Sequence, residues 1–391
     1  MIVSSQTNVC LFSVFLSLAD KARIMNIFKD SRAVLTFDAG GTNFVFSAMK
    51  GGQEIVDPIT LPSNADHLER CMDTIKTGFD QILTRLDVPA VAISFAIPAP
   101  TDYFNGVVGD LKNLPAFRGG VPLAKILENQ YHMPVYMNND GDLYAYGEAL
   151  GGFLPEVNRM MEEAGNPKRF KNLYGLTLGT GFGGGFVSDG TLIRGDNSIA
   201  SEVWIISNSI TPSRNAEEEV SIRAITRNYK KATGQTKEPD LNPKDIYKIA
   251  SGEREGDRDA ALKAFESLGQ HLGDVIANLV CLTDGLVVMG GGIAGADRFF
   301  MPAIMKELGR DFDFRSHDPI PRLIQKAFNL NEESGQKELC KITGKFIDLP
   351  GTDKQVYYDE LPKVAIGTSR IGTDRAISLG AYAFALNQLD R

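Results

Sequence analysis

The sequence predicts an α/β fold with two similar lobes that face a shared cleft. Three observations support this prediction. Short apolar strands alternate with helices along most of the chain. A strand, a glycine turn and a second strand occur together near residues 33–49, and again near 174–187. A third glycine turn follows a buried strand at 286–292.

The elements expected at the start of the chain are a strand hairpin and a long helix. A strand at 33–37 ends at Asp38 and a glycine pair, and a second strand follows at 43–49. Apolar residues at three- and four-residue spacing predict a helix over 63–86, capped by Ser63 or Asn64. The elements expected after it are a strand at 91–95, a helix at 121–130, a strand at 135–137, a strand at 174–178 with its partner at 186–187, a helix at 260–282, a strand at 286–289 and a helix from about 296.

Composition excludes several classes of protein. The 391 residues include 41 basic and 49 acidic side chains, and the net charge of −8 argues against a broad nucleic-acid-binding surface. Four scattered cysteines give neither a CxxC-type zinc site nor a disulfide scaffold, and they indicate a reducing cytoplasm. The apolar run at 10–18 is too short to span a bilayer, and no basic residues precede it as in a signal peptide. We therefore expect a cytoplasmic protein without a membrane segment.

The first glycine turn, Asp38-Ala39-Gly40-Gly41-Thr42-Asn43, is a candidate phosphate-binding loop. Glycines let backbone N–H groups approach a phosphate, and the Thr42 hydroxyl can donate to one. Asp38 would repel a bare phosphate, so its presence is explained if Mg²⁺ lies between the two. The alternative is a glycine-rich hairpin turn with an incidental aspartate.

The second turn has five glycines in seven positions, and its candidate phosphate-binding residues are Gly179, Thr180, Gly181 and Gly183. The pattern GxGxxG is present at 179–184. A hairpin strand rather than a helix is expected after it, which argues against a dinucleotide site. No Gly-Lys-Ser/Thr follows, so it is not a Walker loop. A structural tight turn is the alternative.

The third turn, Gly290-Gly291-Gly292, lies between a buried strand and a helix. Small residues there let a flat ring or a ribose rest against the backbone. A purely structural strand-to-helix turn explains this segment equally well.

Asn139 and Asp140 follow a strand directly and precede a helix. Functional groups often gather at the carboxyl ends of such strands. A carboxylate there can accept the proton of a substrate hydroxyl during phosphoryl transfer, and Asn139 can bond neighbouring hydroxyls. The alternative is that one of the two side chains caps the helix.

The ordered set of motifs resembles the ROK family (repressors, open reading frames and sugar kinases), within the actin-like superfamily. The matching pieces lie over roughly residues 33–300 and keep the family's order. They are FDAGGTN, AIPAP, GVV, KNLP, NNDGDLYAYGEALGG, LTLGTGFGGGFV, SEVW, EEEVSIRAI and LVVMGGGIA. The resemblance implies a two-lobe actin-like ATPase (ribonuclease H-like) fold that binds ATP and Mg²⁺ between its lobes.

The resemblance also implies roles for individual residues. Asp140 would be the catalytic base that deprotonates a sugar hydroxyl. Asp38 and the first two glycine turns would hold Mg²⁺ and the ATP phosphates, and the third turn would border the adenosine. The implied sugar-binding residues are Asn113, Asn139, Glu202 and Glu217.

Two departures from the family pattern affect the sugar side of the site. The histidine of the family's GExGH motif falls at Ile205, beside Trp204. The cysteine-rich zinc motif would lie between Ile206 and Glu217, and that segment contains no cysteine. We therefore expect no zinc site, and we expect another interaction, such as packing of Trp204, to hold the loop.

The expected organisation is an N-terminal extension at 1–30, an N-terminal lobe at 31–142 with the C-terminal helix 375–391, and a C-terminal lobe at 143–374 with an insertion at about 310–362. The expected function is phosphoryl transfer from ATP to a hexose or an N-acetylhexosamine, at the 6-hydroxyl. A sugar-binding sensor that has lost catalysis is the alternative. About 30 residues before the first turn are too few for the family's DNA-binding domain, and the resemblance predicts a homodimer.

Overall fold

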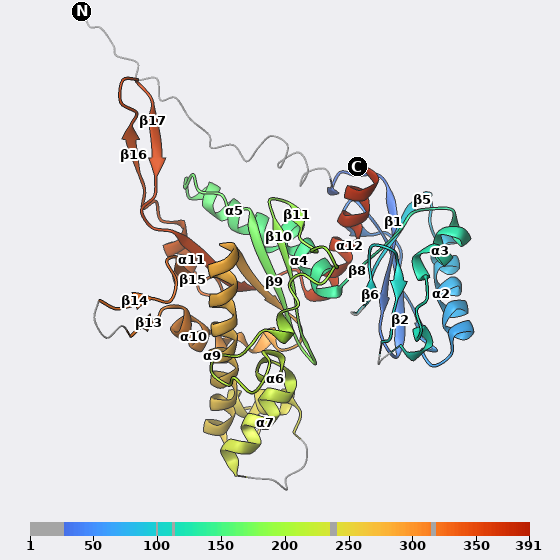
Figure 1. Ribbon diagram of the computed structural model, residues 1–391, viewed down its shortest axis with the longest axis horizontal. Helices are drawn as coiled ribbons and strands as arrows, with labels where there is room; N and C mark the ends of the chain where they lie inside the picture. The colour runs from blue at the N-terminus through green and yellow to red at the C-terminus, as the bar shows by residue number, and fades with distance from the viewer. Residues whose placement is uncertain (1–26, 99–100, 112–113, 235–240, 314–317) are drawn as a thin grey trace, which may run out of the picture.

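The computed structural model describes residues 27–98, 101–111, 114–234, 241–313 and 318–391. Its described part contains two six-stranded sheets. Figure 1 shows them side by side, each with its own helices, and with two helices between them. No helix of the described residues combines the length and the apolar character needed to cross a membrane.

The first sheet has the strand order β3-β2-β1-β5-β8, and β4 pairs with β2. β1 and β2 form the predicted antiparallel hairpin, whereas β5 and β8 continue the sheet in parallel. Phe37 of β1 stacks on Phe46 of β2 and meets Phe95 of β5 edge-on, which anchors the outer core. The strand bounds are β1 (Ala33–Ala39), β2 (Asn43–Lys50), β3 (Gln53–Glu54), β4 (Ile59–Pro62), β5 (Ala90–Ala96) and β8 (Val135–Asn138).

The helix that covers the outer face starts later than the sequence predicts. α2 spans Leu68–Leu83, and its N-cap residue His67 makes no side-chain capping bond. The predicted cap Ser63 instead donates from its hydroxyl to the carbonyl of Gly41, at 2.7 Å. Ser63, which the local pattern assigned to the cap, therefore makes a tertiary contact to the first glycine turn instead. α3 (Leu123–Tyr131) packs beside α2 on this face.

The second sheet has the order β11-β10-β9-β12-β18-β15. Alternate strand residues face two different cores: Leu176 and Met289 pack toward α9, whereas Leu173 and Val288 pack toward α4. The strand bounds are β9 (Asn172–Leu178), β10 (Phe182–Ser188), β11 (Thr191–Leu192), β12 (Leu286–Gly290), β15 (Lys326–Asn329) and β18 (Lys363–Thr368). The helix bounds are α4 (Asp140–Gly151), α5 (Phe153–Glu163), α6 (Glu217–Val220), α7 (Ile222–Thr233), α8 (Pro243–Ser251), α9 (Arg258–Thr283), α10 (Asp297–Leu308) and α11 (Glu333–Cys340).

Two helices, α4 and α12 (Thr373–Leu389), join the two sheets. They share one buried core with residues of both sheets. Their backbones touch at glycines: a Cβ on Gly147 would lie 1.9 Å from the carbonyl oxygen of Ala376, and one on Gly380 equally close to that of Leu143. Close helix contact at these glycines fixes how α4, and therefore Asp140 at its first position, sits between the lobes.

The segment at 310–362 contains elements of two kinds. β15 pairs with β18 and belongs to the second sheet, and α11 follows it. β13 (Asp311–Phe312) and β14 (Ile320–Pro321) form a small separate ribbon. β16 (Lys345–Asp348) and β17 (Gln355–Tyr358) form a second ribbon, which extends away from the lobe in Figure 1. We propose that only these two ribbons are insertions, with the lobes dividing near Asp140.

Candidate active site

The first glycine turn closes the β1–β2 hairpin at the edge of the cleft. Ala39 of β1 pairs with Phe44 of β2, so residues 40–42 and Asn43, the first residue of β2, connect the two strands. A Cβ on Gly40 would lie 2.6 Å from the carbonyl oxygen of Asn43, so the turn requires glycine there. Thr42 and Asn43 are exposed at its tip. The turn therefore presents its backbone and the Thr42 hydroxyl to solvent, as a phosphate site would need.

The second glycine turn is shorter than the glycine run suggests. The N–H of Gly179 bonds to the carbonyl of Gly181, and β10 already begins at Phe182. Gly183 lies within that strand opposite Thr177, where a Cβ would meet the Thr177 hydroxyl at 2.5 Å. Space is open above Gly179, where a Cβ would meet nothing within 4 Å. Gly179, Thr180 and Gly181 thus form the exposed turn, and Gly183 serves the strand.

The third glycine turn packs against the second. The N–H of Ile293 bonds to the carbonyl of Leu178, just before Gly179. Gly291 has φ +88°, and a Cβ there would lie 2.3 Å from that same carbonyl oxygen. A pocket of about 220 Å³ lies beside this turn. It is lined by Met289, Gly290, Gly291, Ala294, Gly295, Asp297, Thr368, Ser369, Gly372 and Thr373.

Asp140 is positioned by a cap and by a close backbone contact. Asn139 is the N-cap of α4, and its side-chain oxygen accepts the Gly141 N–H at 2.7 Å, so the capping role expected as an alternative is present. A Cβ on Gly141 would lie 2.7 Å from the carbonyl oxygen of Gly184. Glycines on both sides of this contact bring the start of α4 against the strand that follows the second turn.

Four carboxylates of the cleft lie near one another. Desolvation raises the pKa of Asp140, although the residue as a whole is exposed. Desolvation also raises the pKa of Asp38, and the charges of Asp374 and Asp140 raise it further. The pKa of Glu202 is raised by desolvation and by Asp140 as well. The structure thus brings the predicted residues Asp38, Asp140 and Glu202 into one site and adds Asp374, from the first turn of α12.

Three further residues near Asp140 carried no local sequence signal. Asp142 is 3% exposed, its Oδ1 has no hydrogen-bond partner, and desolvation raises its pKa to about 8. Arg194 opposes that shift and lies over the rings of Phe104 and Phe384, at 4.4 and 5.1 Å from their centroids. Desolvation and Asp140 raise the pKa of Tyr103, whose hydroxyl donates to the carbonyl of Ile97.

The four predicted sugar-binding residues have different surroundings. Glu202 faces Asp140 and accepts a hydrogen bond from the indole N–H of Trp204, which is 38% exposed. Glu217 instead lies against the second glycine turn: it accepts the Phe182 N–H at 3.1 Å and pairs with Arg223 at 2.8 Å. Asn139 caps α4 as described, and Asn113 lies outside the described residues.

The loop that would carry the zinc motif is held by hydrogen bonds to α9. Thr211 lies 3.2 Å from Nε2 of His271, whose Nδ1 lies 2.8 Å from the carbonyl of Ser267. The N–H of Ser209 donates to Asp274 at 3.4 Å, and Asn208 accepts two backbone N–H groups within the loop. Among the residues that the structure describes, no three histidine, cysteine or acidic side chains are grouped so as to hold a metal ion.

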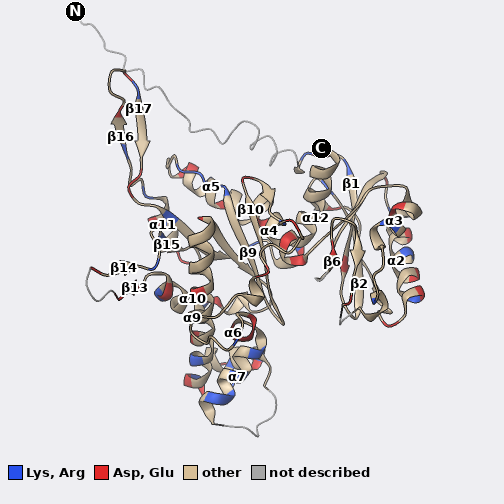
Figure 2. Ribbon diagram, in the orientation of Figure 1, with Lys and Arg blue, Asp and Glu red and all other residues tan. Residues whose placement is uncertain are grey.

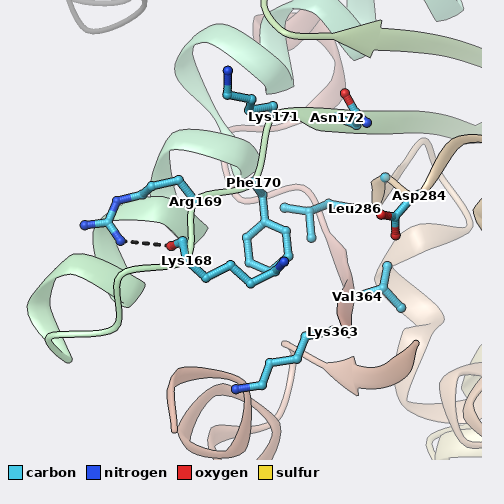
Figure 3. Close-up of a pocket in the computed structure, with 10 residues that line it drawn as sticks. Lys168, Arg169, Phe170, Lys171, Asn172, Asp284, Leu286, Lys363 and Val364 are labelled. Carbon is cyan, nitrogen blue, oxygen red and sulfur yellow. Dashed lines mark hydrogen bonds between the residues drawn. The ribbon is translucent and has the colours of Figure 1, made fainter. Parts of the chain in front are cut away.

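A separate pocket of about 170 Å³ opens near the amino ends of β9, β12 and β18, away from the glycine turns. Figure 3 shows Phe170 at its centre, with Lys171 and Lys363 pointing away from the ring. The ammonium of Lys363 donates to the carbonyl of Lys341 at 2.6 Å, and that of Lys171 pairs with Asp189 at 2.9 Å. Its basic lining is therefore largely engaged within the protein and does not form part of the cleft.

Comparisons with known proteins agree with this site. The chain is 46% identical to glucokinase from Parabacteroides distasonis ATCC 8503, whose crystal structure superposes with a TM-score of 0.85 over 93% of this chain and 99% of that one. It is 27% identical to the glucokinase of Halalkalibacterium halodurans, over 66% of this chain and 80% of the relative. It is 26% identical to the N-acetyl-D-glucosamine kinase of Vibrio cholerae, over 68% of this chain and 85% of the relative.

The family itself is established by a match that covers most of the chain. The ROK family profile matches residues 34–316, which include all three glycine turns, Asp140 and Glu202. The predicted two-lobe actin-like ATPase fold is confirmed by the structural likeness. The chain belongs to the ROK family.

Proposed function

We propose that the protein is an ATP-dependent sugar kinase that phosphorylates a hexose such as glucose or an N-acetylhexosamine. One observation carries this proposal furthest. The Gly141–Gly184 contact sets Asp140 against the strand that follows the second glycine turn, so a base and a phosphate-type loop share one cleft. The names of the relatives, glucokinase and N-acetyl-D-glucosamine kinase, support the substrate class.

Asp140 acts as the general base in this proposal. Desolvation raises its pKa, which makes its carboxylate form a stronger proton acceptor. It takes the proton of the sugar hydroxyl as that oxygen attacks the γ-phosphorus of ATP, and the bond from this phosphorus to the β,γ-bridging oxygen breaks so that ADP leaves. A primary alcohol is the least hindered hydroxyl of a hexose, in agreement with the expected 6-hydroxyl.

The first two glycine turns bind the phosphates, and the 220 Å³ pocket takes the adenosine. Gly179 and Thr180 offer an open cradle, and Thr42 adds a hydroxyl donor. Positioning and charge stabilisation supply most of the catalysis in phosphoryl transfer. Glu202 binds sugar hydroxyls beside Asp140. Glu217 holds the second turn through its bond to the Phe182 N–H, and we propose this in place of sugar binding.

Mg²⁺ fits the acidic side of the cleft. Desolvation raises the pKa of Asp38, and the nearby charges of Asp374 and Asp140 raise it further, a repulsion that a divalent cation would relieve. Carboxylate oxygens and phosphate oxygens are the ligands that Mg²⁺ prefers. When bound, the ion would neutralise charge on the phosphates of ATP. We further propose that the protein works in the cytoplasm, where ATP is available, and that it forms a homodimer.

The decisive experiment measures ADP release with Mg-ATP over a panel of glucose, mannose, fructose, N-acetylglucosamine and N-acetylmannosamine. Asp140→Asn is the matched control, because it keeps the shape of the side chain and removes the base. A kinase loses about 10²- to 10⁴-fold in kcat in this variant and keeps its sugar affinity by calorimetry. Sugar binding without ADP release in the native protein would refute the proposal in favour of a sensor.

A further inference from the structure

A two-stranded arm extends from the second lobe. It consists of β16 and β17, and neither strand pairs with a third strand in the described part of the chain. Figure 1 and Figure 2 show the arm extending well away from both sheets. An isolated hairpin of two strands is only marginally stable in water. Pairing with a further strand would therefore stabilise it.

The arm exposes an unusual amount of apolar surface. Phe346 packs on Tyr357 across the ribbon, with ring centroids 5.5 Å apart, yet Phe346 remains 61% exposed. Exposed apolar clusters of this kind mark surfaces that bind another protein. Six large apolar side chains of the segment 342–358 are 43% to 61% exposed: Ile342, Phe346, Ile347, Leu349, Val356 and Tyr358.

The hydrogen-bond pattern between β16 and β17 shows which backbone groups of β17 point outward. The N–H of Leu349 donates to the carbonyl of Lys354 at 2.8 Å, which identifies the hydrogen-bonded pair beside the loop. Bonded and non-bonded pairs alternate along an antiparallel ladder. Val356 and Tyr358 therefore turn their backbone groups toward β16, whereas Gln355 and Tyr357 turn theirs to the open edge.

We propose that this edge pairs with the β17 edge of a second copy of the chain. With a two-fold axis at Tyr357, this residue lies opposite Tyr357 of the second copy. The two residues exchange backbone hydrogen bonds, because the backbone groups of Tyr357 point to the open edge. The two hairpins then form one four-stranded antiparallel sheet. The residues that face each other across the axis are Lys354 and Glu360, Gln355 and Asp359, and Val356 and Tyr358.

Charge complementarity selects this register and this edge. Lys354 of each copy lies opposite Glu360 of the other, so that Glu360, which already pairs with Lys345 of its own arm at 2.7 Å, has a lysine on each side. Moving the axis to Val356 would instead set Asp353 opposite Asp359. Pairing through β16 about an axis at Phe346 or Ile347 would leave Lys345 opposite an apolar residue.

The test uses light scattering and sedimentation on the full chain, from about 1 to 100 µM protein. The native protein is expected to dimerise. Lys354→Glu and Glu360→Lys each set like charges opposite each other at both ends, and each is expected to weaken the dimer about 10- to 100-fold. A one-to-one mixture of the two variants restores both opposite-charge pairs, so it is expected to dimerise again. Leu282→Lys, at an apolar residue 83% exposed outside the arm, is the control that keeps the native dimer.

Each outcome decides the proposal. Rescue by mixing supports it, because a contact elsewhere on the surface would not depend on the two charges together. A native monomer throughout this range overturns it. A dimer that persists in both single variants also overturns it. So does a mixture of the two variants that stays monomeric although each variant melts at the native temperature. These readouts do not involve catalysis, so they stand or fall apart from the kinase assignment.

Discussion

The indole N–H of Trp204 donates a hydrogen bond to Oε2 of Glu202, two residues earlier in the same loop. This bond lowers the pKa of Glu202 against the larger effect of desolvation, which raises it. It therefore favours the carboxylate form of Glu202 and fixes its position beside Asp140. A single local contact thus orients the acidic group that we propose binds sugar, in a loop that lacks the zinc motif.

Trp204→Phe is expected to raise the KM for sugar about tenfold, because a hydrogen bond to a charged group contributes about 1.5–3 kcal/mol. The ring remains, so packing changes little, and the KM for ATP should stay within a factor of about two. The pKa of Glu202 rises once the indole donor is gone, so the loss of sugar affinity on acidification begins at a higher pH. Steady-state kinetics at several pH values measures both effects.

Ile205→Ala is the matched control, since Ile205 is 60% exposed in the same loop and makes no side-chain hydrogen bond to Glu202. Trp204 is the only tryptophan of the chain, so its fluorescence reports on this loop directly. Its emission should change on titration with the sugar that the protein phosphorylates, and not on titration with Mg-ATP alone. An unchanged sugar KM in Trp204→Phe would rule out the orienting role of the indole.

Gly179→Ala separates a phosphate cradle from a structural turn. A Cβ at Gly179 meets no atom within 4 Å and the residue has no left-handed φ, so the fold should tolerate alanine. The methyl group would occupy the space proposed for a phosphate, and a displacement of about 1 Å can lower kcat/KM for ATP about 100-fold. Melting temperature and ATP kinetics together test this. Native kinetics in this variant would show that the turn does not touch ATP.

Gly40→Ala is the contrasting case. Its Cβ would lie 2.6 Å from the carbonyl oxygen of Asn43, so the hairpin turn must distort. We expect a lower melting temperature together with lower activity, whereas Gly179→Ala lowers activity alone.

Local pattern predicted the glycine turns, Asp38 and Asp140 because each lies at the carboxyl end of a strand, and that end is visible in the sequence. It overextended α2, because the bond of Ser63 to Gly41 depends on a tertiary contact. Arg194 and Asp374 were missed for a related reason: they reach Asp142 and Asp38 from distant segments that carry no motif of their own. Gly183, a predicted phosphate-binding residue, lies inside β10, because a glycine run does not show where its turn ends.

Asp142 predicts how stability depends on pH. Its carboxyl is buried with an unpartnered oxygen, and its pKa of about 8 exceeds the ordinary value of 3.8. The folded state therefore holds a proton that the unfolded chain releases, so this group stabilises the fold fully below about pH 4 and loses that contribution as pH rises to about 8. Asp142→Asn, which does not ionise, should remove this slope and stabilise the protein by several kcal/mol at pH 8.

Thermal melts of the native protein and Asp142→Asn between about pH 5 and 9 measure this difference. Asp189→Asn serves as the control, because Asp189 is an exposed acid whose pairing with Lys171 is solvent-screened. Parallel pH profiles for the native protein and Asp142→Asn would contradict the assignment.

Asp38 and Asp374 predict different responses to Mg²⁺ and to acid. Asp38→Asn removes the proposed ligand, so the Mg²⁺ concentration for half-maximal rate should rise about tenfold or more. Asp374→Asn removes a like charge that raises the pKa of Asp38, so that pKa falls and the acidic limb of the rate profile moves to lower pH. Its Mg²⁺ requirement should change far less, since Asp374 acts here through Asp38. Magnesium titrations at neutral pH and initial rates from about pH 5 to 8 distinguish the two. An unaltered Mg²⁺ requirement in Asp38→Asn would remove Asp38 from the metal site.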